Sequence, residues 1–348
     1  MSGYDSTVRR NLFRLTILPG WLVLGMTIPI FLLGVSVPLR YQFLPLVASV
    51  VVFGLPHGAV DHLTPSRARG RRATLRAMGA VGLLYAVLMA VYGVVWFLFP
   101  VAAFAFFILM TWVHWGQGEI HALATIADVS HLGTPMHRGT VALGRGALPM
   151  LVPLLAFPEQ YRFVAETLVG LFASPDLGAL TVAFTVRGRI VVAVLVGVLL
   201  LVSLTLSYLR RVDDREWVLE AGEVGLLVAF FATVPPILAV GLYFSFWHAL
   251  RHVGRLLALD PGARDALEQG YLAGALARFF RDATPLTVAA LGIVAASTLV
   301  VPTTPVGLAD MVGLYLVVIA VLTLPHVAIV TWLDSEQSVW TGDRIRLT

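Results

Sequence analysis

Four short patches of histidine lie within or at the edge of strongly apolar segments of the chain. They are Pro56-His57-Gly58-Ala59-Val60-Asp61-His62, His114 with Glu119 and His121, Trp247-His248-Ala249-Leu250-Arg251-His252, and Pro325-His326. An imidazole is costly to bury in hydrocarbon, and ionisable residues in such segments usually serve ion sites or proton paths. Several histidines of this kind together predict a metal site or a proton path.

The spacing of two patches favours metal ligation. His248 and His252 are four residues apart, so one helix face presents both rings to a single ion, although simple hydrogen bonding between helices would also use them. His57 follows Pro56, where a bent helix end lets the ring approach an ion. Asp61, one turn later, is placed to orient an imidazole N–H.

The other histidines are weaker candidates. We favour His114 as a ligand, and we expect His121, near the end of the same helix, to support a ligand or lie at the surface. His326 is as readily a packing histidine as a ligand. Histidines in polar stretches are assigned no ligand role, namely His62 as a solvated helix-end residue, and His131 and His137 in a loop.

The composition places these patches in a membrane. Of the 348 residues 58% are hydrophobic and 13% charged, and the mean hydropathy is +0.87. A water-soluble globule of this size does not have such values. The chain has no cysteine, which excludes disulfides, iron–sulfur clusters and thiolate haem, so a metal must be held by nitrogen and oxygen ligands. All 24 basic residues are arginine, which excludes a lysine Schiff base. The pI near 9.7 comes from arginines in loops without a nucleic-acid-binding motif, so no nucleic-acid partner is expected.

Apolar stretches predict an all-α, polytopic transmembrane bundle of about ten helices, forming a single integral membrane domain over residues 1–348. The membrane-embedded part is expected to cover roughly 15–333, with short termini. The predicted spans are 15–37, 43–62, 77–99, 101–123, 140–157, 190–209, 218–239, 241–259, 285–301 and 308–333. The stretch 163–172 is too short to cross and is interpreted as interfacial or re-entrant, and 262–281 as a surface helix.

The arginines predict the orientation of the bundle. Of the 24, 20 fall at alternate helix ends, and the other four are Arg40, Arg162, Arg187 and Arg189. Because cytoplasmic loops are enriched in basic residues, we expect both termini in the cytoplasm and the protein in the plasma membrane. The second, fourth, eighth and tenth spans then carry their histidines at one depth, where facing helices can build a cofactor site. These histidines are His57, His114, His248 and His326.

A site built from imidazoles suits Fe(II), Zn or Cu. A buried zinc hydrolase is expected to show a helical H-E-x-x-H motif, which the sequence lacks. An iron centre that acts with oxygen on a lipid-soluble substrate needs only ligands and an open coordination position.

Aromatic residues flank the candidate ligands. We expect most of them to be core or lipid-facing bulk and a minority to line a substrate tunnel. The residues considered for the tunnel are Trp112, Trp115, Tyr243, Phe244 and Trp247.

Four ordered motifs resemble those of the bacterio-opsin-related and bacterio-opsin-linked (Brp/Blh) β-carotene 15,15′-dioxygenases. They are P-H-G-A-x-D at 56–61, H-aromatic-G-x-x-acid at 114–119, H-x-x-R-H at 248–252 and P-H at 325–326. The resemblance covers about residues 43–333 and implies an integral membrane enzyme that uses Fe(II) and O₂ to cleave β-carotene at its central double bond. The two retinal products would pass to a separate opsin. The chain departs from the family in having Glu119 where an aspartate is more usual, and in a helix ahead of the first motif.

The resemblance also assigns residues. Carried over by motif, the iron ligands are His57, His114, His248 and His252. Carboxylates such as Asp61 and Glu119 would fix imidazole tautomers from behind these ligands, with His121 and His326 as further supporting candidates. The polyene would thread an apolar tunnel, so that the enzyme acts mainly by positioning it.

Other functions also use buried histidines. A membrane di-iron desaturase needs H-x-x-H-H-like boxes, which the sequence lacks. A bis-histidine haem cytochrome predicts a strong Soret band in the purified protein. A proton-coupled transporter with a His/Asp/Arg relay predicts no bound metal and no loss of carotene colour. The cytochrome and the transporter are the alternatives to a carotene-cleaving enzyme.

Overall fold

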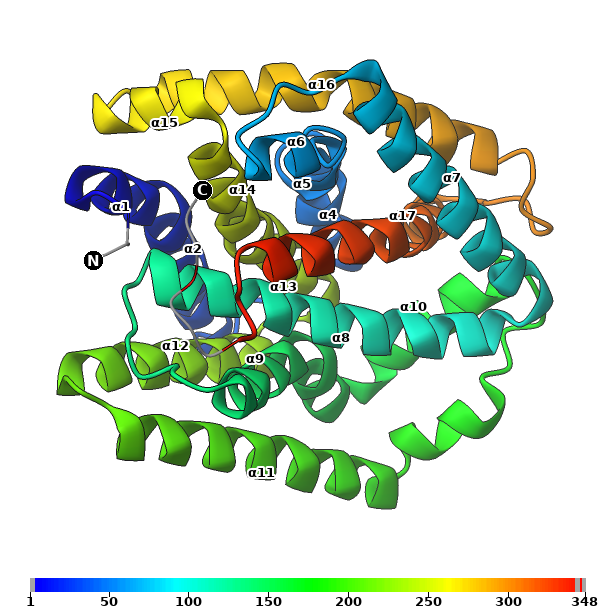
Figure 1. Ribbon diagram of the computed structural model, residues 1–348. Helices are drawn as coiled ribbons and strands as arrows, with labels where there is room; N and C mark the ends of the chain where they lie inside the picture. Colours follow the sequence, from blue (N-terminus) through cyan, green and yellow to red (C-terminus); the bar gives the residue numbers. More distant parts are fainter. Residues whose placement is uncertain (1–3, 342–344, 346–348) are drawn as a thin grey trace.

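Every regular element in the described part of the chain is helical, which confirms the all-α prediction (Figure 1). The computed structural model describes residues 4–341 and 345, so Arg344 and Arg346, which contributed to the predicted orientation, lie outside it. The first half contains α1 (Ser6–Leu12), the π-helix η1 (Phe13–Ile17), α2 (Leu18–Leu32), α3 (Leu39–Gln42), α4 (Leu44–Ser49), α5 (Gly54–Ala59), α6 (Thr64–Ala68), α7 (Leu75–Leu98), α8 (Pro100–Thr125), α9 (Pro135–Ala156) and α10 (Pro158–Gly170). The second half contains the 3₁₀-helix η2 (Gly178–Phe184), α11 (Val186–Arg210), α12 (Asp214–Thr233), α13 (Pro236–Tyr243), the π-helix η3 (Phe244–Ala249), α14 (Leu250–Leu259), α15 (Pro261–Glu268), α16 (Leu272–Ser297) and α17 (Leu308–Glu336).

Eight helical segments of the described chain are long and apolar enough to cross a bilayer, as expected for a multi-pass membrane protein. They are Ser6–Leu32, Leu39–Ala59, Leu75–Leu98, Pro100–Thr125, Pro135–Ala156, Val186–Arg210, Leu272–Ser297 and Leu308–Glu336. The other two predicted spans, 218–239 and 241–259, correspond to α12 and to the run from α13 to α14. These two helical runs bury charged side chains, including Glu223 and Arg251, which lowers their hydropathy.

The predicted boundary near residue 285 is wrong. The stretch 262–281 does not form a separate surface helix, because α16 runs without a break from Leu272 to Ser297 and contains Pro285. Charged residues in this stretch suggested a surface helix, but Arg278 is paired with Asp260 at 2.9 Å, and Asp282, which follows the stretch directly, is paired with Arg67 at 2.5 Å. The short stretch at 163–172 falls on α10, which packs against α8, α9 and α17.

Helix α9 packs against α8 through glycine. A Cβ atom at Gly116 of α8 would overlap the backbone carbonyl of Ala142, and a Cβ at Gly146 of α9 would overlap the carbonyl of Trp112. Small residues allow membrane helices to approach backbone to backbone in this way. The close approach explains the glycine within the 114–119 motif, because it brings the next turn of α8 against α9.

The helices that carry the histidine patches meet in the middle of the molecule. In Figure 1, α17 and α8 cross the centre, with α16 along the top and α11 along the bottom. Helix α8 contacts η3, α14 and α17, and α5 contacts η3 and α14. Segments that are far apart in sequence therefore share one interior region.

Candidate metal centre

Five buried histidine rings close into a circle, hereafter the histidine circle. In order around it they are His57, His248, His114, His326 and His252, and successive ring centroids lie 5.7, 5.0, 5.0, 5.1 and 5.6 Å apart. His57 and His326 also face each other at 4.9 Å. None of the five residues is more than 6% exposed. The prediction that the four patches converge is confirmed.

Local breaks in regular structure aim two of these rings. His57 lies on α5, whose first residue is Gly54; a Cβ there would collide with the carbonyl of Ser49 and the ring of Phe244. His248 lies on the π-helix η3, a wide turn of a kind that is frequent at functional sites. The i, i+4 prediction holds for His248 and His252, because both rings contact His57.

The rings leave nitrogen atoms without hydrogen-bond partners among residues 4–341 and 345. These atoms are both ring nitrogens of His114 and the Nε2 atoms of His248, His252 and His326. Buried polar atoms in proteins are normally paired, so a group of bare imidazole nitrogens at one place requires an explanation. A bound metal ion satisfies such lone pairs, and imidazole suits borderline metals, iron among them.

The spacing of the donor atoms also fits a metal. Two sets of three potential ligand atoms lie within 4.8 Å of one another: His57, His114 and His326, and Asp61, His252 and His326. Imidazoles that share one ion at about 2.1 Å from each nitrogen have ring centroids roughly 4.6 to 5.3 Å apart in neighbouring positions. His326 lies 4.9 to 5.1 Å from three other rings, within that range.

Asp61 supports His326 and not His57. Its Oδ2 accepts hydrogen bonds from Nδ1 of His326 at 2.7 Å and from the hydroxyl of Tyr85 at 2.5 Å. The Nδ1 of His57 donates instead to the carbonyl oxygen of Gly54. The expectation that Asp61 orients the ring one turn before it fails because α5 ends at Ala59, and the following turn directs the carboxylate toward α17.

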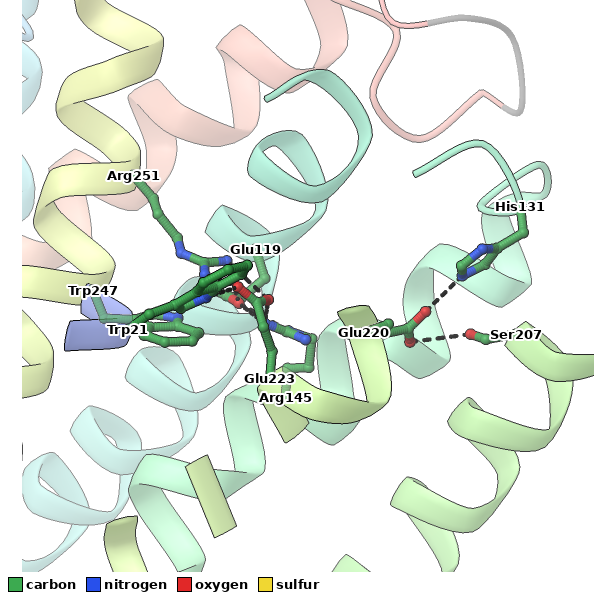
Figure 2. Close-up of polar contacts among 9 residues, drawn as sticks. All are labelled: Trp21, Glu119, His131, Arg145, Ser207, Glu220, Glu223, Trp247 and Arg251. Atoms are coloured by element: carbon green, nitrogen blue, oxygen red, sulfur yellow. Dashed lines mark hydrogen bonds and ion pairs between the residues drawn. The ribbon is translucent and has the colours of Figure 1, made fainter. Parts of the chain in front are cut away.

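Glu119 has a different role from the one expected. Its Oε2 accepts from Arg145 and Arg251 in a buried ion cluster that also contains Glu223, and its Oε1 accepts from Trp247, so no histidine is among the partners found for it in the described chain (Figure 2). One nitrogen of Arg145 lies 2.5 Å from an oxygen of each glutamate, and Arg251 contacts both glutamates. The four side chains are at most 2% exposed.

Two tryptophans donate hydrogen bonds to this ion cluster. Trp247 donates its indole N–H to Glu119 at 2.9 Å, and Trp21 donates to Glu223 at 2.6 Å. Figure 2 shows both indoles beside the guanidinium of Arg251, which lies 4.0 Å from the centre of the Trp247 ring. Trp247 directly precedes His248 of η3, and Arg251 directly precedes His252 of α14. The ion cluster therefore fixes the helical run that carries these two candidate ligands.

His121 lies outside the histidine circle. Its Nδ1 is 3.3 Å from the hydroxyl of Thr125 on the same helix, and the residue is 1% exposed. His62 is half-buried and not a freely solvated end residue; its Nδ1 lies 3.0 Å from the carbonyl oxygen of Ala59.

The expected loop position is correct for His131 and wrong for His137, and both side chains are buried. His131 contacts the buried carboxylate of Glu220 at 2.6 Å, and Ser207 donates to the same carboxylate at 3.0 Å (Figure 2). His137 belongs to α9 and lies 2.9 Å from Ser207. His131 pairs with Glu220 of α12 and His137 with Ser207 of α11, and the sequence around the histidines does not indicate either contact.

An apolar cavity of about 520 Å³ opens onto the histidine circle. Its walls include His57, His114, His248 and His326. Of the aromatics considered for a tunnel, Trp115 and Phe244 line it. The other three, in the described chain, do not line it. Trp112 donates its N–H to the carbonyl of Leu143, and Tyr243 and Trp247 pack in the core. Aromatic residues that the sequence did not single out complete the wall: Phe43, Tyr85, Phe104, Phe107, Tyr161 and Phe163.

Some site residues carried no recognisable signal. Tyr85 lies in an apolar helix without a motif, so its contact with Asp61 could not be found from the sequence. Arg145 and Glu223 did carry one, because a charged residue inside an apolar stretch predicts a buried partner of opposite charge. In the structure, Arg145 pairs with Glu119 and Glu223, and Glu223 pairs also with Arg251.

Comparison with known proteins gives a consistent result. The family model described as beta-carotene 15,15'-dioxygenase matches residues 48–334. The chain is 43% identical over 331 residues to the probable beta-carotene 15,15'-dioxygenase Blh of Halobacterium salinarum, with 95% of each chain covered. It is 29% identical to the probable beta-carotene 15,15'-dioxygenase Brp of the same species over 88% of each. The beta-carotene 15,15'-dioxygenase of an uncultured marine bacterium is 22% identical over 59% of this chain and 66% of its own. No solved structure matches this chain. With its motifs gathered in one buried site and this match over most of its length, the chain belongs to the β-carotene 15,15′-dioxygenase family.

Proposed function

We propose that the protein cleaves β-carotene at its central 15,15′ double bond with O₂ to give two molecules of retinal, using Fe(II). The observation that carries the proposal is the histidine circle on the wall of an apolar cavity inside a membrane protein. The relatives align with most of this chain, and their names support the same substrate and the same cleaved bond. In this reaction one carbon–carbon double bond and one O₂ are consumed and two aldehyde groups are formed.

Four imidazoles would hold the iron: His57, His114, His248 and His252. They are neutral ligands, and the nitrogens left without partners in residues 4–341 and 345 are the atoms available for this purpose. When bound, Fe(II) supplies the activation of dioxygen. The carboxylate of Asp61 lies behind the ring of His326, and that of Glu119 lies in the ion cluster and holds Trp247. Both hold side chains in place without adding negative charge at the ligands.

The cavity would bind and orient the polyene. Its wall is largely apolar, and Trp115 and Phe244 lie next to His248, with Trp115 at 5.4 Å and Phe244 at 6.3 Å between ring centroids. A rigid hydrocarbon placed along this wall would present its central carbons to the histidine circle, and most of the catalytic effect would come from this positioning. The same wall excludes water, which protects reactive species from hydrolysis and proton transfer.

The membrane setting suits this chemistry. β-Carotene and retinal partition into the bilayer, so a multi-pass protein can take up the substrate and release the product without passing either through water. We place the protein in the plasma membrane with both termini in the cytoplasm, on the excess of arginine at alternate helix ends. The retinal would pass to a separate opsin, because this chain has no lysine to form a Schiff base.

The test is expression in a bacterium that accumulates β-carotene. The cells should lose colour and contain retinal, and the purified protein should hold about one iron per chain without a Soret band, since the imidazoles would bind the iron directly and no haem would be present. Persistent colour with folded, iron-loaded protein contradicts the proposal. A Soret band indicates the haem cytochrome instead, and protein without metal in cells that keep their colour indicates the transporter.

A further inference from the structure

His326 occupies a central place in the histidine circle. Its ring lies 4.9 Å from that of His57, 5.0 Å from that of His114 and 5.1 Å from that of His252. It is the residue common to both sets of three ligand atoms that lie within 4.8 Å of one another. His248, by contrast, belongs to neither of the sets found among the described residues. His326 is therefore placed at least as well as His248 to share an ion with the other rings of the circle.

The contact with Asp61 determines which nitrogen of His326 is free. Nδ1 lies 2.7 Å from Oδ2 of Asp61, a carboxylate that only accepts, so Nδ1 carries the proton. The Tyr85 hydroxyl, 2.5 Å from the same oxygen, holds the carboxylate in place. Nε2 therefore carries a lone pair, and it is buried without a partner in the part of the chain that the structure describes.

A packing role does not account for this arrangement. An unpaired buried acceptor is unfavourable, and although His121 also leaves its Nε2 bare, that ring lies outside the circle, whereas the bare Nε2 of His326 belongs to a ring in the circle beside those of His114 and His252. A carboxylate that accepts from one nitrogen while the other is bare is the arrangement that metal-bound histidines adopt. Gly58 leaves room beside this ring, since a Cβ atom at that position would be 3.4 Å from Nδ1 of His326.

We propose that His326 is a further ligand of the metal, bound through Nε2 and oriented by Asp61 and Tyr85, so that five imidazoles surround one ion. This inference rests on the proposed function, since it assumes that the histidine circle holds a metal. Five neutral donors exceed the four that zinc prefers in protein sites and leave a six-coordinate ion a single open position. The arrangement therefore favours iron or cobalt over zinc and allows one small molecule to bind at a time.

The test measures Co(II) binding to the metal-depleted, full-length protein in detergent, by competition with a chelator. His326→Ala should weaken binding by more than the about 10- to 100-fold that loss of a supporting residue causes. Added free imidazole should restore part of the affinity and of the visible Co(II) spectrum, which it cannot do for a purely structural defect. Asp61→Asn and Tyr85→Phe should weaken binding within the about 10- to 100-fold range.

His121→Ala is the matched control. His121 is as buried as His326 and lies on a helix of the same site, but outside the circle, so its removal should leave Co(II) affinity unchanged. Thermal unfolding of the metal-free variants shows whether each one is folded, and His326→Gln replaces His326→Ala if the smaller side chain prevents folding.

The outcomes separate the two proposals. Wild-type affinity in a folded His326 variant contradicts the fifth ligand and leaves the metal site intact. Failure of the wild-type protein to bind either Co(II) or Fe(II) contradicts the metal site itself, and with it the proposed function. Loss of binding in His326→Ala that free imidazole reverses supports the fifth ligand.

Discussion

Arg145 binds Glu119 through two nitrogens, Nε at 2.8 Å and Nη2 at 2.5 Å, where each side chain is only 1% exposed. A charged pair so deep in a membrane bundle is stabilising only while every charge keeps its partner, because an unpaired buried ion is strongly unfavourable. Glu223 and Arg251 complete a neutral set of four.

The first prediction follows from this balance. Glu119→Gln should destabilise the protein by about 3 to 5 kcal/mol, since it leaves an excess positive charge in the buried cluster. The double change Glu119→Gln with Arg145→Gln restores neutrality and should lose less stability than the sum of the single changes. Denaturant titration in detergent measures both. If the double variant lost as much stability as the two single variants together, the charges would not be coupled.

The second prediction concerns the four ligands that the family motif assigns. Substitution of His57, His114, His248 or His252 by Ala should abolish iron binding and retinal formation, because each change removes a neutral donor. His121→Ala should retain both. Iron content and retinal yield should be measured on the same membrane preparations at matched expression, so that misfolding is not mistaken for lost ligation. Retained iron in a variant would remove that histidine from the ligand set.

The third prediction revises the expectation for the histidines near residue 131. His131→Ala should lower stability by about 1 to 3 kcal/mol, because it removes a hydrogen-bond partner from the buried carboxylate of Glu220. Iron content per folded chain should not change, since the contact joins His131 to Glu220 of α12 and involves no residue of the histidine circle. Thermal unfolding and metal analysis of the purified variant decide the point. Unchanged stability would mean that water replaces the imidazole.

The fourth prediction tests the contact between α8 and α9. Gly116→Ala should cost about 1 to 3 kcal/mol or more, because its Cβ would overlap the backbone of Ala142, which cannot rotate away. Gly139→Ala on α9 is the control, as no described atom beyond its chain neighbours and the nearby backbone of its own helix lies within 4 Å of its Cβ position, and it should be neutral or slightly stabilising. Melting temperatures of the two variants in one detergent provide the comparison.

The fifth prediction separates substrate binding from metal binding. Thr111 lines the cavity one turn before His114, so Thr111→Phe should obstruct the polyene and lower carotene cleavage by at least about tenfold, while iron content stays the same. Thr111→Val keeps the shape and removes a hydroxyl that is without a partner in the described residues, so it should be nearly silent. Retinal formation per bound iron is the measurement. A fall in iron content for Thr111→Phe would mean that the residue shapes the metal site.

The sequence predicted the convergence of the patches because they lie on the second, fourth, eighth and tenth predicted spans, which run in the same direction through the membrane and so bring the patches to one depth. The i, i+4 spacing of His248 and His252 also predicted a shared face correctly. Pairings between helices could not be predicted in this way. Whether Asp61 contacts His57 or His326 depends on where α5 ends and how α17 packs, and neither is encoded near residue 61.

Two other differences have the same origin. The charged start of α16 resembled a surface helix because its partners, Asp260 and Arg67, belong to other segments. Trp247 and Tyr243 resembled tunnel residues because they are near a candidate ligand in sequence, yet the helix turns them toward the ion cluster and the core. In each case a residue's environment is set by an element far away in the chain.

The bond between Asp61 and His326 joins residues 265 positions apart, and it lies at the histidine circle. A ribosome delivers the chain from its first residue, so the membrane receives Asp61 and His57 long before α17 emerges. The circle cannot close until translation of that last long helix is complete and it has entered the bilayer. On the proposed function, the circle would therefore take up its metal only late in biogenesis, after α17 has joined the other helices.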